Sequence, residues 1–347
     1  MAYSTIPKGS LYTNTKLYTG NGSTNAITGV GFQPSLVWLK ERSDSGAPIL
    51  FDAVRGATKF VRSSDSAAEV TAADTLTAFN SDGFTLGADA GDYSANQNSK
   101  TYASWNWKAN GQGSSNTAGT INTTYTSVDT TAGFSIIKYV GNGTANATIG
   151  HGLGVEPSMI LFKNLASNNW IVYQKSMGTG QYLTLNLTNS RDSASGAWCT
   201  PSATLIQLNQ VFGATNTSGA TYIAYAFADV KGYSNVGGSY TGNGNADGTF
   251  IYTGFSPSFV MTKRTDGTGG WFMQDDKRLG YNYANYRLFA DDSAAESTAS
   301  RIDLLSNGFK CRDNDGNGNG FTYIYMAFAE NPFVATSGTT ALPVTAR

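Results

Sequence analysis

The stretch Thr101-Tyr102-Ala103-Ser104-Trp105-Asn106-Trp107 returns twice further along the chain. Its counterparts are Thr221-Tyr222-Ile223-Ala224-Tyr225-Ala226-Phe227 and Thr322-Tyr323-Ile324-Tyr325-Met326-Ala327-Phe328. In each copy the side chains alternate with a period of two, which is typical of a β-strand with two distinct faces. Self-similarity of this kind predicts one β unit repeated three times.

Two other markers precede this strand in each copy. The first is a Gly-Asn-Gly turn, whose glycines accept positive φ at little cost. The second is Pro-Ser-x-(Val/Ile)-x-x-Lys, in which an apolar run without alternation predicts a core strand covered on both faces, ended by a lysine that reaches water. The glycines and prolines that define these markers are Gly20, Gly22, Pro34, Gly141, Gly143, Pro157, Gly242, Gly244 and Pro257.

A further marker is Asp-Ser-Ala, present as Asp65–Glu69, Asp192–Ser195 and Asp292–Glu296. In two copies Ser-x-x-Glu resembles a capping box, so one short helical turn per unit is compatible with the pattern. Repeats of about 100 residues with short strands and many turns are typical of β-sandwich or jelly-roll modules. The expected fold is therefore all-β, with three tandem sandwich units and short helical turns at most.

The markers also set the unit boundaries. They predict unit 1 at 1–109, a Gly/Ser/Thr/Asn-rich linker or surface loop at 110–131, unit 2 at 132–230 and unit 3 at 231–333. Residues 334–347 form a small, Thr-rich tail that is either a strand lent to a neighbour or a loose end. The short connection between units 2 and 3 favours a fixed orientation of these two units.

Composition excludes several classes of protein. The 347 residues include 23 Lys+Arg and 24 Asp+Glu, so the net charge of −1 offers no basic surface for nucleic acid. No apolar run approaches membrane-spanning length, and the first residues lack a signal peptide pattern, so we expect a soluble chain without membrane insertion. Two distant cysteines, Cys199 and Cys311, predict neither a disulfide nor a zinc site, and both are expected to be reduced.

Candidates for catalysis are weak. The single histidine, His151, lies between two glycines with no acid in its motif, and Cys199 beside Trp198 is typical of a buried apolar thiol. The pairs Asp275-Asp276 and Asp291-Asp292 suggest glycan hydrolysis only if a loop brings both carboxyl groups to one side, and a structural role at turns fits better. We therefore predict no catalytic residues and no cofactor.

Two binding possibilities remain open in the sequence. The run Asp313–Gly320 is rich in Asp, Asn and Gly but fails the EF-hand spacing, so we assign no metal site, leaving ion binding by this loop as an alternative to a plain turn. Trp170, Trp198 and Trp271 fall outside the marker strands. They are either buried or exposed platforms on which glycans stack.

Several segments of the sequence resemble those of a known family. These are Leu17–Thr24, Ile27–Pro34, Asp52–Lys59, Ser81–Gly87 and Tyr323–Glu330. They are similar to a family of tailed-bacteriophage virion proteins, common among marine phages and usually described as tail fibre or structural proteins. The resemblance spans nearly the whole chain and implies a β-rich, non-enzymatic particle component made in the bacterial cytoplasm and located in the virion. It supplies no catalytic residues.

This resemblance sets the functional expectation. It implies a tail appendage, of the tail fibre or receptor-binding type, that contributes to host-surface attachment. A capsid decoration or cement protein is the alternative, and a polysaccharide-degrading tailspike ranks third. The expected partners are other virion proteins of the tail or capsid, host-surface glycans and further copies of the chain in a symmetric homo-oligomer.

Overall fold

The computed structural model describes residues 4–278 and 284–332 of the chain. Its regular elements there are β-strands and two short 3-10 turns, η1 (Gly9–Leu11) and η2 (Lys175–Met177). A search of these residues finds no helix with the length and apolar character needed to cross a membrane. The all-β expectation is confirmed.

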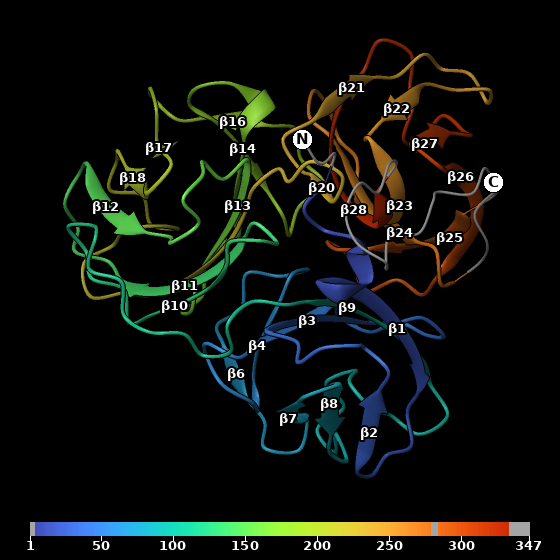
Figure 1. Cartoon of the computed structure of the whole chain (residues 1–347), viewed down its shortest axis with the longest axis horizontal. Coiled ribbons are helices and arrows are strands. Elements are labelled where there is room, and N and C mark those ends of the chain that lie inside the picture. The colour runs from blue at the N-terminus through green and yellow to red at the C-terminus, as the bar shows by residue number, and fades with distance from the viewer. Residues whose placement is uncertain (1–3, 279–283, 333–347) are drawn as a thin grey trace.

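The strands form three units that repeat one arrangement and appear as three lobes in Figure 1. Unit 1 contains β1 (Thr13–Thr19), β2 (Asn25–Thr28), β3 (Leu36–Glu41), β4 (Ile49–Asp52), β5 (Lys59–Arg62), β6 (Val70–Thr71), β7 (Leu76–Asn80), β8 (Gly83–Leu86) and β9 (Thr101–Trp107). Unit 2 contains β10 (Tyr125–Asp129), β11 (Phe134–Val140), β12 (Ala147–Gly150), β13 (Met159–Asn164), β14 (Ile171–Gln174), β15 (Gln181–Thr184), β16 (Asp192–Ser193), β17 (Cys199–Pro201), β18 (Leu205–Leu208) and β19 (Thr221–Phe227). Unit 3 contains β20 (Ser234–Asn235), β21 (Ser239–Thr241), β22 (Phe250–Tyr252), β23 (Phe255–Arg264), β24 (Trp271–Asp275), β25 (Ala284–Phe289), β26 (Ser297–Leu305), β27 (Gly308–Cys311) and β28 (Thr322–Pro332).

Each unit is built on a large antiparallel sheet. The order is β1-β9-β3-β4-β5-β6 in unit 1 and β10-β11-β19-β13-β14-β15-β16 in unit 2, and small sheets β2-β8-β7 and β12-β18-β17 complete the two sandwiches. In unit 3 the corresponding strands form one continuous path, β20-β28-β23-β24-β25-β26-β27-β22, with β21 also paired to β28. The repeated closing strands β9, β19 and β28 thus occupy the same place, beside β3, β13 and β23.

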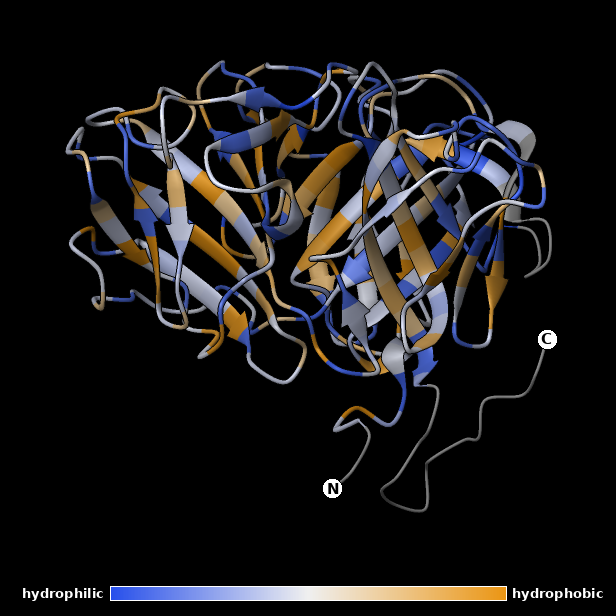
Figure 2. Ribbon diagram, turned by 90° about the horizontal axis from the view of Figure 1, so that it is seen from above, coloured by the Kyte–Doolittle hydropathy of each residue, from blue (hydrophilic) through white to orange (hydrophobic). Residues whose placement is uncertain are grey.

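The large sheets are buried on both faces. In β3, Val37 and Leu39 pack toward the small sheet of unit 1, whereas Leu36 and Trp38 belong to a core shared by all three units. Figure 2 shows the hydrophobic residues distributed along the strands. Burial on two sides explains why the run after Pro34 is apolar without alternation, as predicted.

The shared core, which we call the central core, closes around three equivalent aromatic residues. Trp107, Phe227 and Phe328 contact one another pairwise, with ring centroids 6.2 Å apart for Trp107–Phe227, 5.6 Å for Trp107–Phe328 and 5.9 Å for Phe227–Phe328. Their edge-to-face geometry is the favourable one for aromatic pairs. The units therefore form a three-membered ring rather than a string of separate modules.

The marker lysines link neighbouring units. Contrary to the expectation that they reach water, the marker lysines are buried, because each one contacts the preceding unit of the ring; they are Lys40, Lys163 and Lys263. Lys40 Nζ donates to Ser293 O at 3.0 Å, Lys163 Nζ to Ser66 O at 3.1 Å, and Lys263 Nζ to Asn189 O at 2.8 Å. Burial lowers the pKa of each of the three amino groups to about 8.

These contacts define three junctions and correct one marker. Junction 1–2 contains Lys163, junction 2–3 contains Lys263, and junction 3–1 contains Lys40. The carbonyl groups of Ser66 and Ser293 also accept backbone N–H groups from the neighbouring unit, and in unit 2 that place is taken by Thr188, not by Ser193. Asp192–Ser195 is therefore not the structural equivalent of Asp65–Glu69 and Asp292–Glu296. The prediction was wrong because only similarity in composition relates this segment to the other two.

The capping-box interpretation is also wrong. Neither Ser-x-x-Glu segment is helical, because both glutamates serve the junctions instead. The N–H of Glu69 donates to Leu165 O, and the N–H of Glu296 donates to Arg42 O, each at 2.9 Å.

The stretch 110–131 is part of unit 2, not a linker. It contains β10, which pairs with β11 over Tyr125–Asp129, and Ile121 bridges to Ile149 of β12. Buried threonines and isolated apolar residues anchor a strand in this stretch, although its polar composition does not indicate one. The tail 334–347 lies outside the described residues.

The glycines of the Gly-Asn-Gly markers have distinct physical reasons. A Cβ on Gly20, Gly141 or Gly242 would lie 2.2–2.4 Å from a backbone carbonyl oxygen, so only glycine fits. Gly22, by contrast, has φ of +62°, and its equivalents Gly143 and Gly244 are similar. Pro157 directly precedes the segment leading into β13, while Pro257 lies at a register shift within β23, where a missing N–H is tolerated.

Candidate functional site

The residues considered for catalysis lie in structural positions. His151 is buried, accepts the N–H of Leu153 through Nδ1 at 3.2 Å and lies 3.1 Å from Ser202 O through Nε2. Desolvation lowers its pKa, which favours the neutral ring. Burial raises the pKa of the Cys199 thiol and raises that of Cys311 to about 12, so neither is an activated nucleophile.

The adjacent acids have separate roles. Asp275 is bound by Arg278 Nε at 2.7 Å and by Trp105 Nε1 at 3.0 Å, whereas Asp276 pairs with Lys277 at 2.8 Å. Asp291 accepts the backbone N–H of Trp271 at 2.9 Å. Burial raises the pKa of both Asp276 and Asp291 to about 6. Asp275 is held by groups of two units, whereas one buried oxygen of Asp276 and one of Asp291 have no hydrogen-bond partner among the described residues.

The three tryptophans proposed as stacking platforms are buried, with at most 1% of their surface exposed. Trp170 Nε1 donates to Arg62 O across junction 1–2, and Trp271 Nε1 donates to Thr184 O across junction 2–3. Trp198 packs inside unit 2 against Phe162. The glycan-stacking interpretation is wrong for these residues, because their rings complete interior contacts that the sequence does not reveal.

The loop Asp313–Gly320 holds a structural asparagine. Asn317 is fully buried, and its Nδ2 donates to Asn243 Oδ1 and to Asn245 O, both at 2.8 Å. Asn96 and Asn216 hold the Gly-Asn-Gly turns of units 1 and 2 in the same way. Across residues 4–278 and 284–332 no cluster of three or more His, Cys, Asp or Glu side chains is placed to hold a metal ion.

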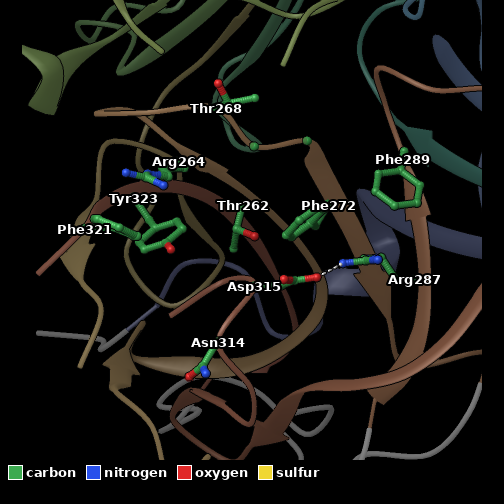
Figure 3. A pocket seen from close by; sticks show the side chains of 12 residues that line it. Thr262, Arg264, Thr268, Phe272, Arg287, Phe289, Asn314, Asp315, Phe321 and Tyr323 are labelled. Carbon is green, nitrogen blue, oxygen red and sulfur yellow. Dashed lines mark hydrogen bonds and ion pairs between the residues drawn. The ribbon is translucent and has the colours of Figure 1, made fainter. Parts of the chain in front are cut away.

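A pocket of about 400 Å³ opens in unit 3 and is the best candidate for a functional site (Figure 3). This volume lies within the range of about 300–1,000 Å³ that is common for small-molecule sites. The pocket combines four aromatic residues, two arginines and several small polar groups. Its lining residues are Thr262, Arg264, Thr268, Gly269, Gly270, Phe272, Arg287, Phe289, Asn314, Asp315, Phe321 and Tyr323.

Both arginines in the pocket are held by carboxylates and aromatic rings. Arg264 lies 3.3 Å above the centre of the Phe321 ring, and its Nε donates to Asp266 Oδ1 at 2.8 Å. Arg287 lies 4.4 Å from the Phe272 ring centre, and its Nη1 donates to Asp315 Oδ2 at 3.1 Å. The pairing fixes the guanidinium planes and brings the Arg287–Asp315 pair to the pocket wall, as Figure 3 shows.

Strands from far apart in the sequence assemble this wall. Thr262 and Arg264 come from the end of β23, Phe272 from β24 and Arg287 from β25, while Asp315 comes from the loop before β28. Phe321 is 38% exposed at the rim. The pocket therefore presents flat apolar surfaces beside fixed donors and acceptors.

A family model matches residues 8–332, so it extends over all three units. The chain belongs to this family, defined by a domain of unknown function (DUF7483). Comparisons with curated proteins and with solved structures gave no match. Because the match covers the whole ring, the domain of this family is the three-unit assembly and not the single repeat.

Sequence reasoning missed the pocket, although one signal was present. The residue before each marker lysine is Leu39 in unit 1 and Phe162 in unit 2 but Thr262 in unit 3. A polar residue at a position that is apolar in two copies marks the place where unit 3 departs from the common core.

Proposed function

We propose that this protein is a structural component of a tailed-phage virion, a tail appendage that contributes to host-surface attachment. The proposal starts from the resemblance of the Leu17–Thr24, Asp52–Lys59 and Tyr323–Glu330 phrases to phage virion proteins. It assigns the chain a binding and structural role, with no catalytic step.

The closed ring is the observation that carries the proposal. Each unit contributes one buried lysine to its neighbour, and all three contribute aromatic rings to the central core. In a ring held together in this way each unit is joined to both of its neighbours, which suits a rigid platform on a particle. Three similar units also let one chain occupy a position of threefold symmetry.

A capsid decoration protein is the second candidate, and the same ring favours it. A body with three similar lobes can cap a threefold position of an icosahedral shell as readily as the end of a trimeric tail appendage. In either case the expected partners are other virion proteins.

Copy number separates the two candidates. Quantitative mass spectrometry of purified particles measures this protein relative to the major capsid protein. A few copies per particle support the tail appendage, and a number comparable with the capsid subunits supports decoration. Absence from the particles would overturn both.

A further inference from the structure

The pocket in unit 3 lies at two strand positions where the other two units carry hydrophobic or aromatic side chains. Leu39 and Phe60 are fully buried in the sandwich of unit 1. By strand register the corresponding residues of unit 3 are Thr262 and Arg287. In unit 2 the first of these positions is the buried Phe162. At these two positions unit 3 has polar side chains, while two residues further along the strand Phe289 takes the position of Arg62 of unit 1.

Arg287 brings a guanidinium to a position that is apolar in unit 1. Arg287 is only 8% exposed, and a guanidinium so placed is costly unless it is paired and hydrogen-bonded. Unit 1 folds with Leu39 and Phe60 at these positions. Unit 2 folds with Phe162 and the half-buried Tyr182, whose hydroxyl donates to Asp192. A local departure from the pattern that the rest of the molecule follows is expected at a functional site.

The chemistry of the wall indicates the ligand. Asp315 and Asn314 contribute a carboxylate and an amide group to the wall, and the two arginines contribute planar guanidinium groups with N–H donors. The rings of Phe272 and Phe321 lie beside these polar groups. Hydroxyl groups both donate and accept, so a polyhydroxylated ring can satisfy such a set while its C–H face packs on an aromatic ring.

Charge distinguishes neutral from acidic sugars. Arg287 is paired with Asp315, and Arg264 is paired with Asp266. Because each guanidinium already has a carboxylate partner, a ligand carboxylate would have to compete with Asp315 or Asp266 for it. A neutral ring needs no such exchange.

We propose that this pocket binds a neutral pyranose residue of a surface glycan. The inference deepens the proposed role in host attachment by naming the class of receptor and the unit that contacts it. Units 1 and 2 then act as scaffold.

The test uses the full-length purified protein and a panel of neutral hexose and deoxyhexose oligosaccharides, with oligomers of uronic acids as the acidic arm. Binding is measured by saturation-transfer NMR and titration calorimetry. The key variant is T262L/R287F, which installs the unit 1 residues and fills the pocket. Asp315→Asn removes one charged acceptor, and Asp44→Asn, which breaks the surface pair with Lys100 in unit 1, is the matched control.

We expect at least one neutral oligosaccharide to bind the wild type. Binding should be lost in T262L/R287F and weakened at least about tenfold in Asp315→Asn, as for loss of a hydrogen bond to a charged group. The Asp44→Asn variant should bind as the wild type does. Circular dichroism and the unfolding midpoint of T262L/R287F establish that the variant is folded.

Failure to bind any neutral sugar, binding of uronic acid oligomers alone, or unchanged binding in T262L/R287F would overturn the inference. These results leave the virion assignment standing, because copy number tests it separately. Glycan binding by a protein absent from particles would instead overturn the proposed function and keep the sugar site.

Discussion

Junctions 1–2 and 2–3 solve the same packing problem with different chemistry. At junction 1–2, Asp52 of unit 1 accepts the Tyr225 hydroxyl at 2.7 Å and is paired with the buried Arg55. At junction 2–3 the corresponding residue is Gln174, which donates to Val236 O at 3.2 Å and Gly238 O at 3.0 Å, and Met177 stands in the place of the arginine.

The residue that the neighbouring unit places against this position also differs between the junctions. The residue that faces the acid is Tyr225 at junction 1–2 and Trp105 at junction 3–1, and both donate a hydrogen bond. The equivalent residue of unit 3 is Met326, which donates none. Buried charge is therefore not required by the ring geometry, in keeping with the small net benefit of buried ion pairs over apolar packing.

The largest expected effect comes from breaking the ionic junction on one side. Asp52→Ala leaves the Arg55 guanidinium buried beside Leu50 O and Tyr225 without its main partner. We expect a loss of about 3–5 kcal/mol in the free energy of unfolding, against about 1–2 kcal/mol for Gln174→Ala. Urea unfolding followed by tryptophan fluorescence measures both.

A combined variant sharpens this comparison. Asp52→Gln, Arg55→Met and Tyr225→Met together install the residues of junction 2–3 at junction 1–2. The unfolding free energy should return to within about 1–2 kcal/mol of the wild type. If the triple variant is as unstable as Asp52→Ala, the two junctions are not interchangeable and the comparison fails.

The next effect concerns the three buried lysines, which all junctions share. Their pKa in the folded protein is about 8, below the ordinary value of 10.5, so the unfolded chain binds more protons between these values. Stability should therefore rise as the pH increases from 8 toward 10. Above pH 10 it should fall again, because burial raises the pKa of Tyr139 and Tyr240 well above 10 and unfolding releases their protons.

Lys163→Met tests the origin of that slope. The variant should show about 1–2 kcal/mol less gain between pH 8 and pH 10 than the wild type. The readout is the difference in unfolding free energy between the two pH values, which is separate from any constant loss due to the carbonyl groups that Lys163 leaves. An exposed lysine, Lys175, gives the control, since Lys175→Met should keep the wild-type slope.

The smallest effect distinguishes the two ionic junctions from each other. Arg42 binds Glu296 at 2.8 Å across junction 3–1, while the equivalent residue at junction 1–2 is Leu165. Arg42→Leu should cost about 1 kcal/mol at low salt, and less in high salt because the arginine is partly exposed. A loss that does not change with salt would show that packing, not charge, holds this contact.

Much of the fold could be predicted from the sequence, and the reasons are local. Alternation in Thr101–Trp107 and its copies, glycine at Gly20 and the apolar run after Pro34 all report on backbone conformation and burial. The relation between units could not be read in this way. The sequence predicts Lys40 in solvent, because nothing near it in the chain indicates that Ser293 of unit 3 lies against it.

The candidate site was harder to predict for the same reason. Trp170 and Trp271 are large aromatic residues outside the marker strands, yet both form contacts at the junctions. The residues of the pocket, such as Arg287 and Asp315, come from separate strands and loops and share no motif. Only comparison of equivalent positions, Leu39 with Thr262, distinguishes a pocket wall from a core.

Ring closure has a consequence for how the chain is made. Lys40 and Ser293 are 253 residues apart, so junction 3–1 forms only after nearly the whole chain has left the ribosome. Until then Trp105 and Trp107 of unit 1 lack the Phe259 and Phe328 rings that cover them. During synthesis the molecule is an open arc with an aromatic face exposed to other nascent chains, and arrival of β28 removes that face.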